Sequence, residues 1–450
     1  MAAIDLTATS EICRMSAVEM AQRIRKGELS ARETLAAHLA QIERVNPRVN
    51  AIVTLVAERA LEAAVRADEC QARGRVLGPL HGLPIAHKDL QPTKGIRTTF
   101  GSRIFRDFVP EEDSPLVERI KGAGAITIGK TNTPEFGAGS QTFNQVFGAT
   151  LNPWDLTKTC GGSSGGGAVS VATFMLPIAD GTDVGASLRN PAAFCNVVGF
   201  RPSEGRVPAS ASIPFGVEGP MARSVADVAF FFSAISQSAE PLVRDFKGVR
   251  IAWWKDLGGI PVDPEIREIT NAQRQVFESL GCIVEEAEPD FDGADFVFRT
   301  LRFQGAAQRL GEHAKQHPQL LKDTIHWEIE QSRLLSPGDV EAARLKHSEL
   351  QQRMARFLER YEFFVLPVSQ CQPFDVTEPW PSMIAGTRMG NYIDWFKSCY
   401  YISVMGTPAI SVPCGFTQEG LPVGQQIVGR RQNDWNVLGI ANAYSEALKT

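Results

Sequence analysis

The sequence predicts an α/β fold in which a central sheet is covered by helices. Between about residues 76 and 235, short apolar segments typical of strands alternate with helical segments and glycine-rich loops, which is the pattern of an α/β sheet. A strand–helix–strand unit follows over residues 248–290. No Pro/Ser-rich linker separates these parts, so we expect one domain over residues 1–450, with both units in the same sheet.

The beginning of the chain is helical. Ser16 with Glu19, and Ser30 with Glu33, have the spacing of two capping boxes, in which a serine and an acid three residues later satisfy the free amides of a helix start. We expect these helices to pack on the outside of the domain.

Lys88 is the first candidate catalytic residue. It follows the apolar run 83–86, which predicts a strand that ends in the core. Burial disfavours the ammonium form, and a shift of the lysine pKa from roughly 10.4 to about 7–8 would make it a usable base. Asp89 would raise that pKa, so its side chain must point elsewhere. His87 should face the opposite side of the strand as a structural residue.

Ser163 lies in a glycine-rich tract, residues 161–167, whose composition alone is typical of a flexible linker. Its surroundings favour an ordered turn, because a small-residue helix over 168–174 and a short buried strand over 176–179 follow directly.

Ser187 lies 24 positions after Ser163 in a second glycine-rich turn. The small residues 184–187 leave backbone N–H groups accessible to a developing oxyanion. We expect Ser187 at a loop-to-helix junction, with Asp183 and Arg189 as structural holders of the loop. Two serines and a buried lysine supply a nucleophile, a relay and a base, which predicts a hydrolase of amide-type bonds.

The second half of the chain predicts three further elements. Residues 249–254 and 282–284 read as strands, and a helix is expected from about Pro264 to Leu280. These three elements form the strand–helix–strand unit.

A helical insertion is predicted at about residues 298–392. Residues 298–360 read as mostly helical and 362–368 as an apolar strand. The stretch 369–392, which contains Trp380, combines turn residues with aromatic side chains. We expect the insertion and this loop to shape the substrate pocket.

The motifs carry a resemblance to the amidase signature family. The chain resembles it in the two serine motifs, in residues 129–136, in residues 152–154, and in the closing segments 406–413 and 420–424. The resemblance runs from about residue 15 to the C-terminus. It implies the amidase signature fold, a central mixed twisted sheet with helices on both faces, and places the catalytic core at about residues 76–235.

The resemblance also assigns roles. It implies that Ser187 is the acyl-forming nucleophile, Ser163 the middle member of the relay and Lys88 the terminal base, with a cis peptide bond between Gly162 and Ser163. It further implies that the backbone amides of residues 184–187 form the oxyanion hole.

The remaining implied binding positions surround the nucleophile. Besides the amide of Ser187, the implied oxyanion hole uses Val184, Gly185 and Ala186, and Gly137 lines the substrate channel. Ala186 departs from the family pattern, which has a second glycine there. An alanine could narrow the turn or exclude a positive φ, but it is the smallest side chain that could be added, and we expect activity to survive.

The sequence also offers two alternative sites, a nucleophile of the α/β-hydrolase type and a pair of histidines that could bind a metal. Overlapping Gly-x-Ser-x-Gly matches at Ser163 and Ser164 would suit an α/β-hydrolase esterase, which needs a downstream acid and histidine. The downstream histidines all fall in helical sequence, which disfavours that site. His313 and His317 could share a helix face, but Ala314 stands where a zinc protease motif has Glu, so no metal or cofactor is implied.

Composition narrows the class of protein. The chain is 43% hydrophobic and 22% charged, as expected of an enzyme with a large core. Its net charge of −5 is spread without runs, so we expect a small-molecule substrate, no nucleic acid and no membrane segment. Eight cysteines without a Cys-x-x-Cys pair suit reduced thiols. The first nine residues lack the features of a secretory signal, so we expect the cytoplasm.

Three functions compete at this stage. The first is a stand-alone hydrolase of amides, anilides or carbamates. The second is an amidotransferase component that works on charged tRNA with partner chains, which the same family contains. The third is a scaffold with a decayed site, which the retained Lys88, Ser163 and Ser187 disfavour. The sequence does not determine the oligomeric state, and a homodimer is one arrangement considered.

Overall fold

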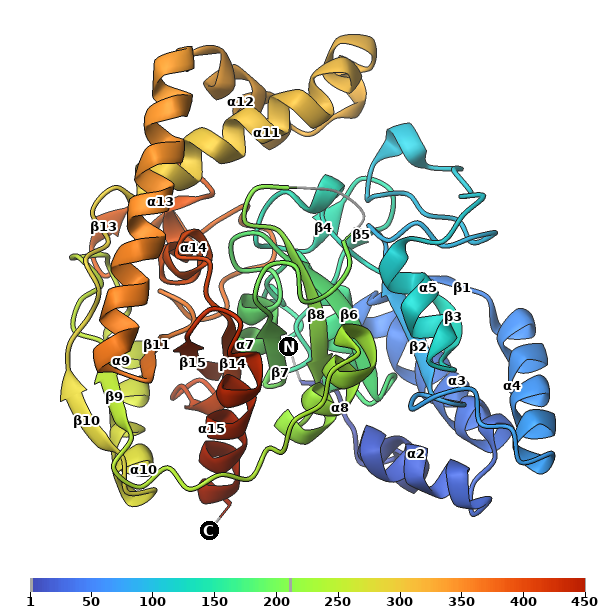
Figure 1. Cartoon of the computed structure of the whole chain (residues 1–450). Helices are drawn as coiled ribbons and strands as arrows, with labels where there is room; N and C mark the ends of the chain where they lie inside the picture. The colour runs from blue at the N-terminus through green and yellow to red at the C-terminus, as the bar shows by residue number, and fades with distance from the viewer. Residues whose placement is uncertain (1–2, 210–212, 450) are drawn as a thin grey trace.

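The computed structural model describes residues 3–209 and 213–449. Its largest sheet, within those residues, has eight strands (Figure 1). In spatial order they are β10 (Ile283–Glu286), β9 (Arg250–Trp253), β11 (Phe363–Pro367), β15 (Pro422–Gly429), β14 (Ala409–Phe416), β7 (Val198–Arg201), β8 (Val217–Ala222) and β6 (Ile178–Asp183). The pairs β10–β9 and β9–β11 are parallel and the others antiparallel, so the sheet is mixed, as expected.

Helices cover both faces of this sheet. Gly199 in β7 faces α7 (Arg189–Cys195), since a Cβ there would lie 2.8 Å from the Cβ of Ala192. The next residue, Phe200, packs edge-on against Phe232 of α8 (Val225–Ser236), with ring centroids 5.1 Å apart. Successive strand residues point to opposite faces, so α7 and α8 lie on opposite sides. Helix α15 (Asp434–Ala447) packs against α8.

The strand that carries Lys88 belongs to a separate, three-stranded sheet, in the order β1 (Ile52–Leu55), β3 (Ile126–Thr131), β2 (Pro84–Lys88). The expectation of a single sheet was therefore wrong. Strand β2 lies beside β6 of the large sheet, but the two strands are not paired through their backbones. A side chain joins them instead: the backbone N–H of Lys88 donates to Asp180 Oδ1 at 2.7 Å. Which strands pair is decided by such long-range contacts, which no local pattern records.

The N-terminal helices form as predicted, with one difference at a cap. Helix α3 (Ala31–Val49) begins with the expected capping box of Ser30 and Glu33. At α2 (Ala17–Lys26), Ser16 caps the helix, but the Glu19 carboxylate forms an ion pair with Arg23 at 2.7 Å instead of reaching back to the Ser16 amide. Helix α3 packs against α4 (Ala57–Ala72) at the edge of the molecule (Figure 1).

The predicted helix over residues 264–280 is broken in two. Helix α9 (Pro264–Ala272) and helix α10 (Arg274–Ser279) meet at Gln273. Together with β9 and β10 they complete the predicted strand–helix–strand unit, which lies in the large sheet as expected.

A helical arm rises from the sheet (Figure 1). It consists of α11 (Ala294–Gln316), α12 (Asp323–Arg333) and α13 (Pro337–Arg360), after which the chain enters β11. The predicted helices over 298–360 and the strand over 362–368 are thus confirmed. Within the described residues, none of the helices has the length and apolarity needed to cross a bilayer.

The remaining elements are short. They are α1 (Glu11–Arg14), α5 (Pro115–Gly122), α6 (Gly165–Ala172), α14 (Lys397–Val404), β4 (Phe143–Asn144), β5 (Gly148–Ala149), β12 (Met383–Ile384), β13 (Thr387–Arg388), and the 3₁₀ turns Arg103–Phe105, Glu135–Gly137, Pro318–Leu320 and Asp394–Phe396.

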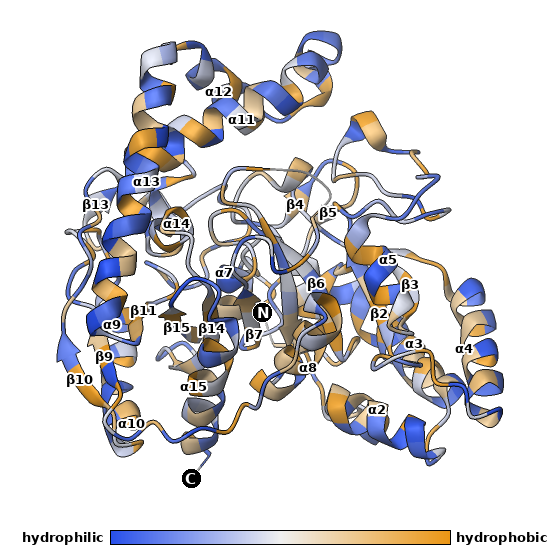
Figure 2. Cartoon of the chain, in the orientation of Figure 1, coloured by the Kyte–Doolittle hydropathy of each residue, from blue (hydrophilic) through white to orange (hydrophobic). Residues whose placement is uncertain are grey.

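Strand β2 lies between the two large apolar clusters of the core. Ile85 belongs to the cluster that packs on the large sheet, and Ala86 belongs to the cluster that includes the buried residues of α3 and α6. Hydrophobic residues line the inner sides of the covering helices and hydrophilic ones their outer sides (Figure 2). The apolar clusters on the two sides of β2 exclude water, so Lys88, the last residue of the strand, lies in the interior.

Candidate active site

Lys88 is surrounded by hydroxyl groups. All five residues of β2 are buried, and the ammonium position at the strand end has three oxygen neighbours. Nζ lies 2.7 Å from Ser163 Oγ, 2.8 Å from Ser164 Oγ and 2.8 Å from Thr182 Oγ1. No carboxylate forms an ion pair with this amine among the described residues.

Burial lowers the pKa of Lys88 to about 7, although the carboxyl groups of Glu218, Asp183 and Asp180 act in the opposite direction. Two of these acids are engaged elsewhere: Asp183 pairs with arginines, and Asp180 Oδ2 lies 2.5 Å from His87 Nδ1. A lysine with a pKa near 7 is neutral in a large fraction of molecules at neutral pH, which is the state that a base requires.

The neighbours of Lys88 in the sequence point away from it, as expected. Asp89 accepts hydrogen bonds from the backbone N–H of Thr99 at 3.1 Å and from its hydroxyl at 2.5 Å. His87 is fully buried, with Nδ1 against Asp180 and Nε2 3.0 Å from Thr127 Oγ1. Both residues therefore serve the structure around the strand.

The serine tract 161–167 is a packed turn and not a linker. The peptide bond between Gly162 and Ser163 is cis, as the resemblance implied. A Cβ at Gly165 would lie 2.3 Å from Thr142 Oγ1, and one at Gly166 2.3 Å from the Asn132 amide nitrogen, so only glycine fits these positions. This close packing holds Ser163, which is 2% exposed, against the lysine.

Ser164 differs from Ser163 in what its hydroxyl already contacts. Its Oγ lies 3.3 Å from the carbonyl oxygen of Thr182, to which it can donate, and accepts from the Thr182 backbone N–H at 3.3 Å. The hydroxyl of Ser163 has its only hydrogen-bond partner among the described residues in Lys88, and Ser163 lies in the wall of a cavity.

Ser187 lines the same cavity as Ser163, at the start of α7 as predicted. Its carbonyl accepts from the Ser164 backbone N–H at 3.3 Å, which ties the two serine turns together. Its hydroxyl makes no hydrogen bond within the described part of the chain. The backbone N–H groups of residues 184–187 likewise donate to no group there, so they remain available to a ligand oxygen.

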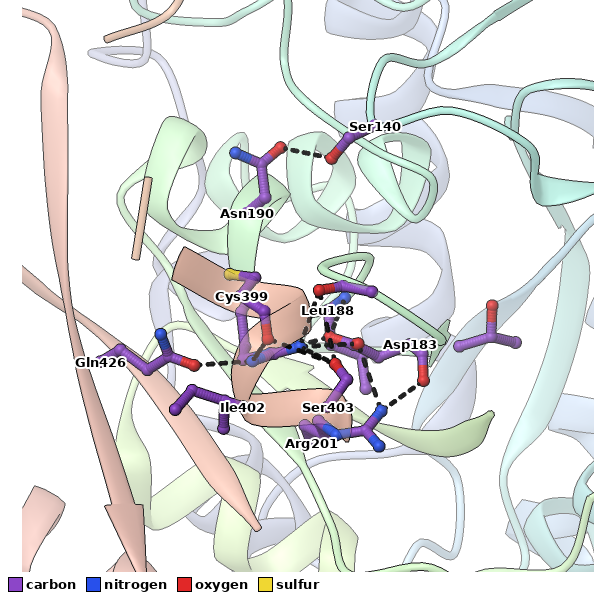
Figure 3. A network of polar contacts seen from close by, with 12 residues as sticks. Ser140, Asp183, Leu188, Asn190, Arg201, Cys399, Ile402, Ser403 and Gln426 are labelled. Atoms are coloured by element: carbon purple, nitrogen blue, oxygen red, sulfur yellow. Dashed lines mark hydrogen bonds and ion pairs between the residues drawn. The ribbon is translucent and has the colours of Figure 1, made fainter. Parts of the chain in front are cut away.

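A buried ion-pair network fixes the loop before Ser187 (Figure 3). The guanidinium of Arg189 donates to both carboxylate oxygens of Asp183 at 3.0 Å and to the carbonyl of Gly185 at 3.0 Å. It also reaches Gln426 in β15 at 2.6 Å and Ser403 in α14 at 2.7 Å.

The Asp183 carboxylate is the centre of this network. Oδ2 also accepts from the Leu188 backbone N–H at 3.1 Å, and Arg201 lies 3.3 Å from Oδ1. The pKa of Asp183 is below its usual value, because the two arginines outweigh the effect of burial. Asp183 and Arg189 thus hold the loop, as expected.

Small residues line the cavity at three positions that the sequence singled out, Gly185, Ala186 and Gly137. A Cβ at Gly185 would lie 3.1 Å from the rings of both Phe298 and Phe396, so a larger residue there would have to displace these rings slightly. Ala186 has no left-handed backbone conformation, and the alanine fits. Gly137 has φ +69°, and a Cβ there would lie 2.8 Å from Leu90 and 3.6 Å from Ser163 Oγ.

The cavity has a volume of about 260 Å³. One wall consists of the two serine turns and Gly137; the opposite wall comes from one face of α11, through Arg302, Gly305, Arg309 and Leu310, and from Glu328 of α12. Residues 369–392 contribute none of the described lining residues; Tyr392 only supports Arg302, through a hydrogen bond of 3.0 Å. Trp380 is therefore not at the wall.

The alternative sites weighed from the sequence do not assemble. No histidine contacts Ser163 or Ser164 within the described residues; His313, for example, stacks on Phe136 with an interplanar angle of 12°. No group of three or more His, Cys, Asp or Glu side chains there is placed to hold a metal ion. All eight cysteines are free.

Sequence reasoning missed several residues of the site. Thr182 and Ser164 both contact the amine. Ser164 is next to Ser163 and Thr182 lies five residues before Ser187, so their proximity to the site could have been suspected. Asp180 and Glu218 had no such signal, since their position depends on the pairing of β6 with β8.

Comparisons with known proteins agree with this geometry. The model of the Amidase family matches residues 33–438. The chain is 34% identical to a Glutamyl-tRNA(Gln) amidotransferase subunit of Moorella thermoacetica, over 98% of each chain. It is 33% identical to an acylamidase of Rhodococcus erythropolis, over 97% of this chain and 95% of that protein.

The fold agrees as well. A bacterial aryl acylamidase of the amidase signature family superposes with a TM-score of 0.90 at 27% identity, over 97% of both chains. The family match, the shared fold and the lysine between two serine turns lead to one conclusion: this chain belongs to the Amidase family, the amidase signature enzymes.

Proposed function

We propose that this chain hydrolyses the C–N bond of a linear amide through an acyl-enzyme on Ser187, with Ser163 as the proton relay and Lys88 as the base. The observation that carries the proposal is the 2.7 Å contact between Lys88 Nζ, buried and with a lowered pKa, and the hydroxyl of Ser163 at the cavity wall.

In the acylation step, Ser187 Oγ attacks the carbonyl carbon of the substrate. The Ser187 proton passes to Ser163 Oγ while the Ser163 proton passes to Lys88 Nζ, so the net change is one proton on the lysine. The carbonyl becomes an oxyanion, which the free N–H groups of residues 184–187 would stabilise. We expect the Ser163–Ser187 hydrogen bond to form when substrate fills the cavity.

The tetrahedral intermediate then collapses. The C–N bond breaks, the nitrogen takes the proton of Ser163, and Ser163 regains a proton from the Lys88 ammonium; the amine leaves and Ser187 carries the acyl group. Protonation is essential, because an amine anion is a very poor leaving group. Water then attacks the acyl carbonyl through the same relay, releases the acid and restores the neutral lysine.

Amides and anilides are the substrate class supported by the relatives named acylamidase and aryl acylamidase. Carbamates present the same carbonyl and nitrogen to the relay, and we include them. The cavity of about 260 Å³ suits a small molecule.

A second candidate is a component of an amidotransferase, because a relative of that name is 34% identical over nearly the whole chain. Such a component would work with partner chains on a charged tRNA. The purified chain alone should hydrolyse a 4-nitroanilide if the first proposal is right; turnover that appears only with partner chains and charged tRNA would favour the second.

The decisive experiment is to label the protein with a fluorophosphonate and map the modified peptide. We expect the adduct on Ser187, and Ser187→Ala should remove both labelling and anilide turnover. Ser170→Ala changes another buried serine near the tract, within α6, and is the matched control. An adduct on Ser163 or Ser164 would overturn the assignment.

A further inference from the structure

Glu218 lies in the cavity wall beside the proposed proton relay. It stands directly opposite Thr182 in the β6–β8 ladder, where paired Cβ atoms are about 4.5–5.5 Å apart. The hydroxyl of Thr182 in turn contacts Lys88 Nζ at 2.8 Å. A substrate whose carbonyl reaches Ser187 would therefore pass close to this carboxyl group.

Within the part of the chain that the structure describes, only one of the two carboxyl oxygens of Glu218 has a partner. Oε2 accepts from the side-chain amide of Gln91 at 2.7 Å, and Gln91 is oriented by Ser114, which donates to its Oε1 at 2.7 Å. Oε1 accepts no hydrogen bond and forms no ion pair with any of the described residues. The residue is 7% exposed and lines the cavity of about 260 Å³, so a ligand in the cavity is placed to meet this carboxyl group.

The other acid of the wall differs in this respect. Glu328 pairs with Arg302 at 2.8 Å, so its charge is already compensated. Glu218 forms no ion pair with any of the described residues, and a buried carboxyl group with one oxygen unpaired is costly. To accept the hydrogen bond of Gln91, this position needs a single oxygen, and a glutamine there would supply one with a smaller free-energy cost of burial than a carboxyl group. A purely structural role therefore leaves the second oxygen of Glu218 unexplained.

The protonation state of Glu218 does not change this argument. Burial raises its pKa to about 8, with Asp180 acting in the same direction and the Gln91 hydrogen bond and Lys88 in the opposite one. Both the acid and its anion keep an oxygen that can accept a hydrogen bond.

We infer that Glu218 is a specificity-determining residue, which accepts a hydrogen bond from an N–H or O–H group of the substrate close to the scissile carbonyl. The chain would then select amides that carry an amino or hydroxyl substituent near that bond over hydrocarbon amides of the same shape. A buried acceptor left unpaired by the wrong substrate is an effective means of discrimination. This inference rests on the proposed function, since it uses the same cavity.

The test compares substrates that differ in one group. On the acyl side, alanine 4-nitroanilide and lactic acid 4-nitroanilide are compared with isobutyric acid 4-nitroanilide, in which a methyl group replaces the donor. On the amine side, N-(2-aminoethyl)acetamide is compared with N-propylacetamide. We expect kcat/KM to favour the donor substrate by about tenfold or more on one of the two sides, and the side identifies where the donor binds.

Glu218→Met then removes the acceptor at similar volume. We expect it to lower the preference for the donor substrate to within about twofold, whereas Glu218→Gln, which keeps an oxygen acceptor, should retain part of it. Fluorophosphonate labelling of Ser187 in both variants reports whether the site is intact. If Glu218→Met does not fold, the test rests on Glu218→Gln: a partial loss of the preference for the donor substrate supports the inference, and an unchanged preference contradicts it.

Two outcomes would overturn the inference. The first is that the wild type shows no preference for the donor substrate on either the acyl or the amine side. The second is that kcat/KM falls equally for the donor substrate and its hydrocarbon counterpart in the folded variants. Failure of the proposed function looks different, because Ser187→Ala would then still turn over the substrates.

Discussion

At the residue scale, the proposed reaction depends on whether one buried amine is charged. Lys88 ends a strand that is buried throughout, and its three oxygen neighbours are hydroxyl groups. Hydroxyl groups solvate an ammonium less well than water or a carboxylate does, and burial therefore dominates the pKa. A fully paired lysine at this position would stay protonated and could not accept a proton.

The pH dependence follows from this pKa. Below pH 7, Lys88 holds a proton and cannot act as a base, so kcat/KM for an anilide should fall about tenfold for each pH unit on the acid side and level off above pH 7. The measurement is a pH–rate profile from pH 5 to 9.

A second buried lysine provides the control for that profile. Burial lowers the pKa of Lys130 to about 8, but the hydrogen bonds of this amine within the described residues go to the Gln91 carbonyl and to the hydroxyl groups of Thr93 and Thr98, and none goes to a serine of the cavity. Lys130→Met should leave the acid limb at about pH 7. A profile without an acid limb, or one that moves in Lys130→Met, would contradict the assignment of the base.

The residues of the relay were within reach of sequence reasoning, because each lies in a local motif with its own chemical logic. Lys88 ends an apolar run, and the two serines lie in turns where only small residues fit. Glu218 was not within reach, because a glutamate in an apolar segment gives no sign of which strand it will face.

At the element scale, the turn that holds Ser187 depends on a charge network buried in the fold. Asp183 is fully buried between Arg189 and Arg201. Arg189 belongs to α7 but bonds to α14 and β15 as well, so three elements are positioned by one side chain.

Asp183→Asn should destabilise the protein by about 3–5 kcal/mol, because it leaves two buried guanidinium groups without their counter-charge. Urea unfolding followed by circular dichroism measures the loss, and anilide turnover should fall with it because the 184–187 loop loses its anchor.

An exposed ion pair is the comparison for Asp183. Glu278→Gln breaks the surface pair with Arg274, where both side chains are at least 40% exposed, and should change stability by no more than about 0.5 kcal/mol. A small effect of Asp183→Asn, similar to that of Glu278→Gln, would mean that the network does not hold the loop.

Elements with a strong local pattern were predictable, and their partners were not. The helices of the arm follow from a local composition rich in charged residues and glutamine, and strand β11 follows from an apolar run. The division into two sheets does not, because it depends on an Asp180 side chain that takes the place of a backbone ladder beside β2.

At the scale of the whole molecule, the cavity is formed by parts that are distant in the sequence. The serine turns belong to the sheet core, and the opposite wall belongs to the helical arm, more than a hundred residues later. The arm can therefore vary the shape of the cavity without altering the relay.

Leu310→Trp should narrow the cavity, because Leu310 is 5% exposed and lines its wall. We expect kcat/KM for an anilide with a bulky acyl group to fall at least tenfold more than that for acetanilide-type substrates. The measurement is the ratio of the two rates in one preparation.

Leu334→Trp is the control for this prediction, since Leu334 follows α12 in the same arm and is 77% exposed. It should leave the ratio of rates unchanged. If Leu310→Trp also leaves it unchanged, the arm does not limit the size of the acyl group.

The hydroxyl groups of Ser163 and Ser164 around Lys88 differ in one respect that would give the proposed proton path a direction. The hydroxyl of Ser164 can donate to the Thr182 carbonyl at 3.3 Å, and a hydroxyl group that does so has no hydrogen left to give to the amine. Ser163 has no other acceptor among the described residues, and its hydrogen is free to rotate between the amine and the cavity. In the proposed mechanism a single carbonyl group therefore makes two adjacent serines unequal, and Ser163 is the one that passes protons between Lys88 and the cavity.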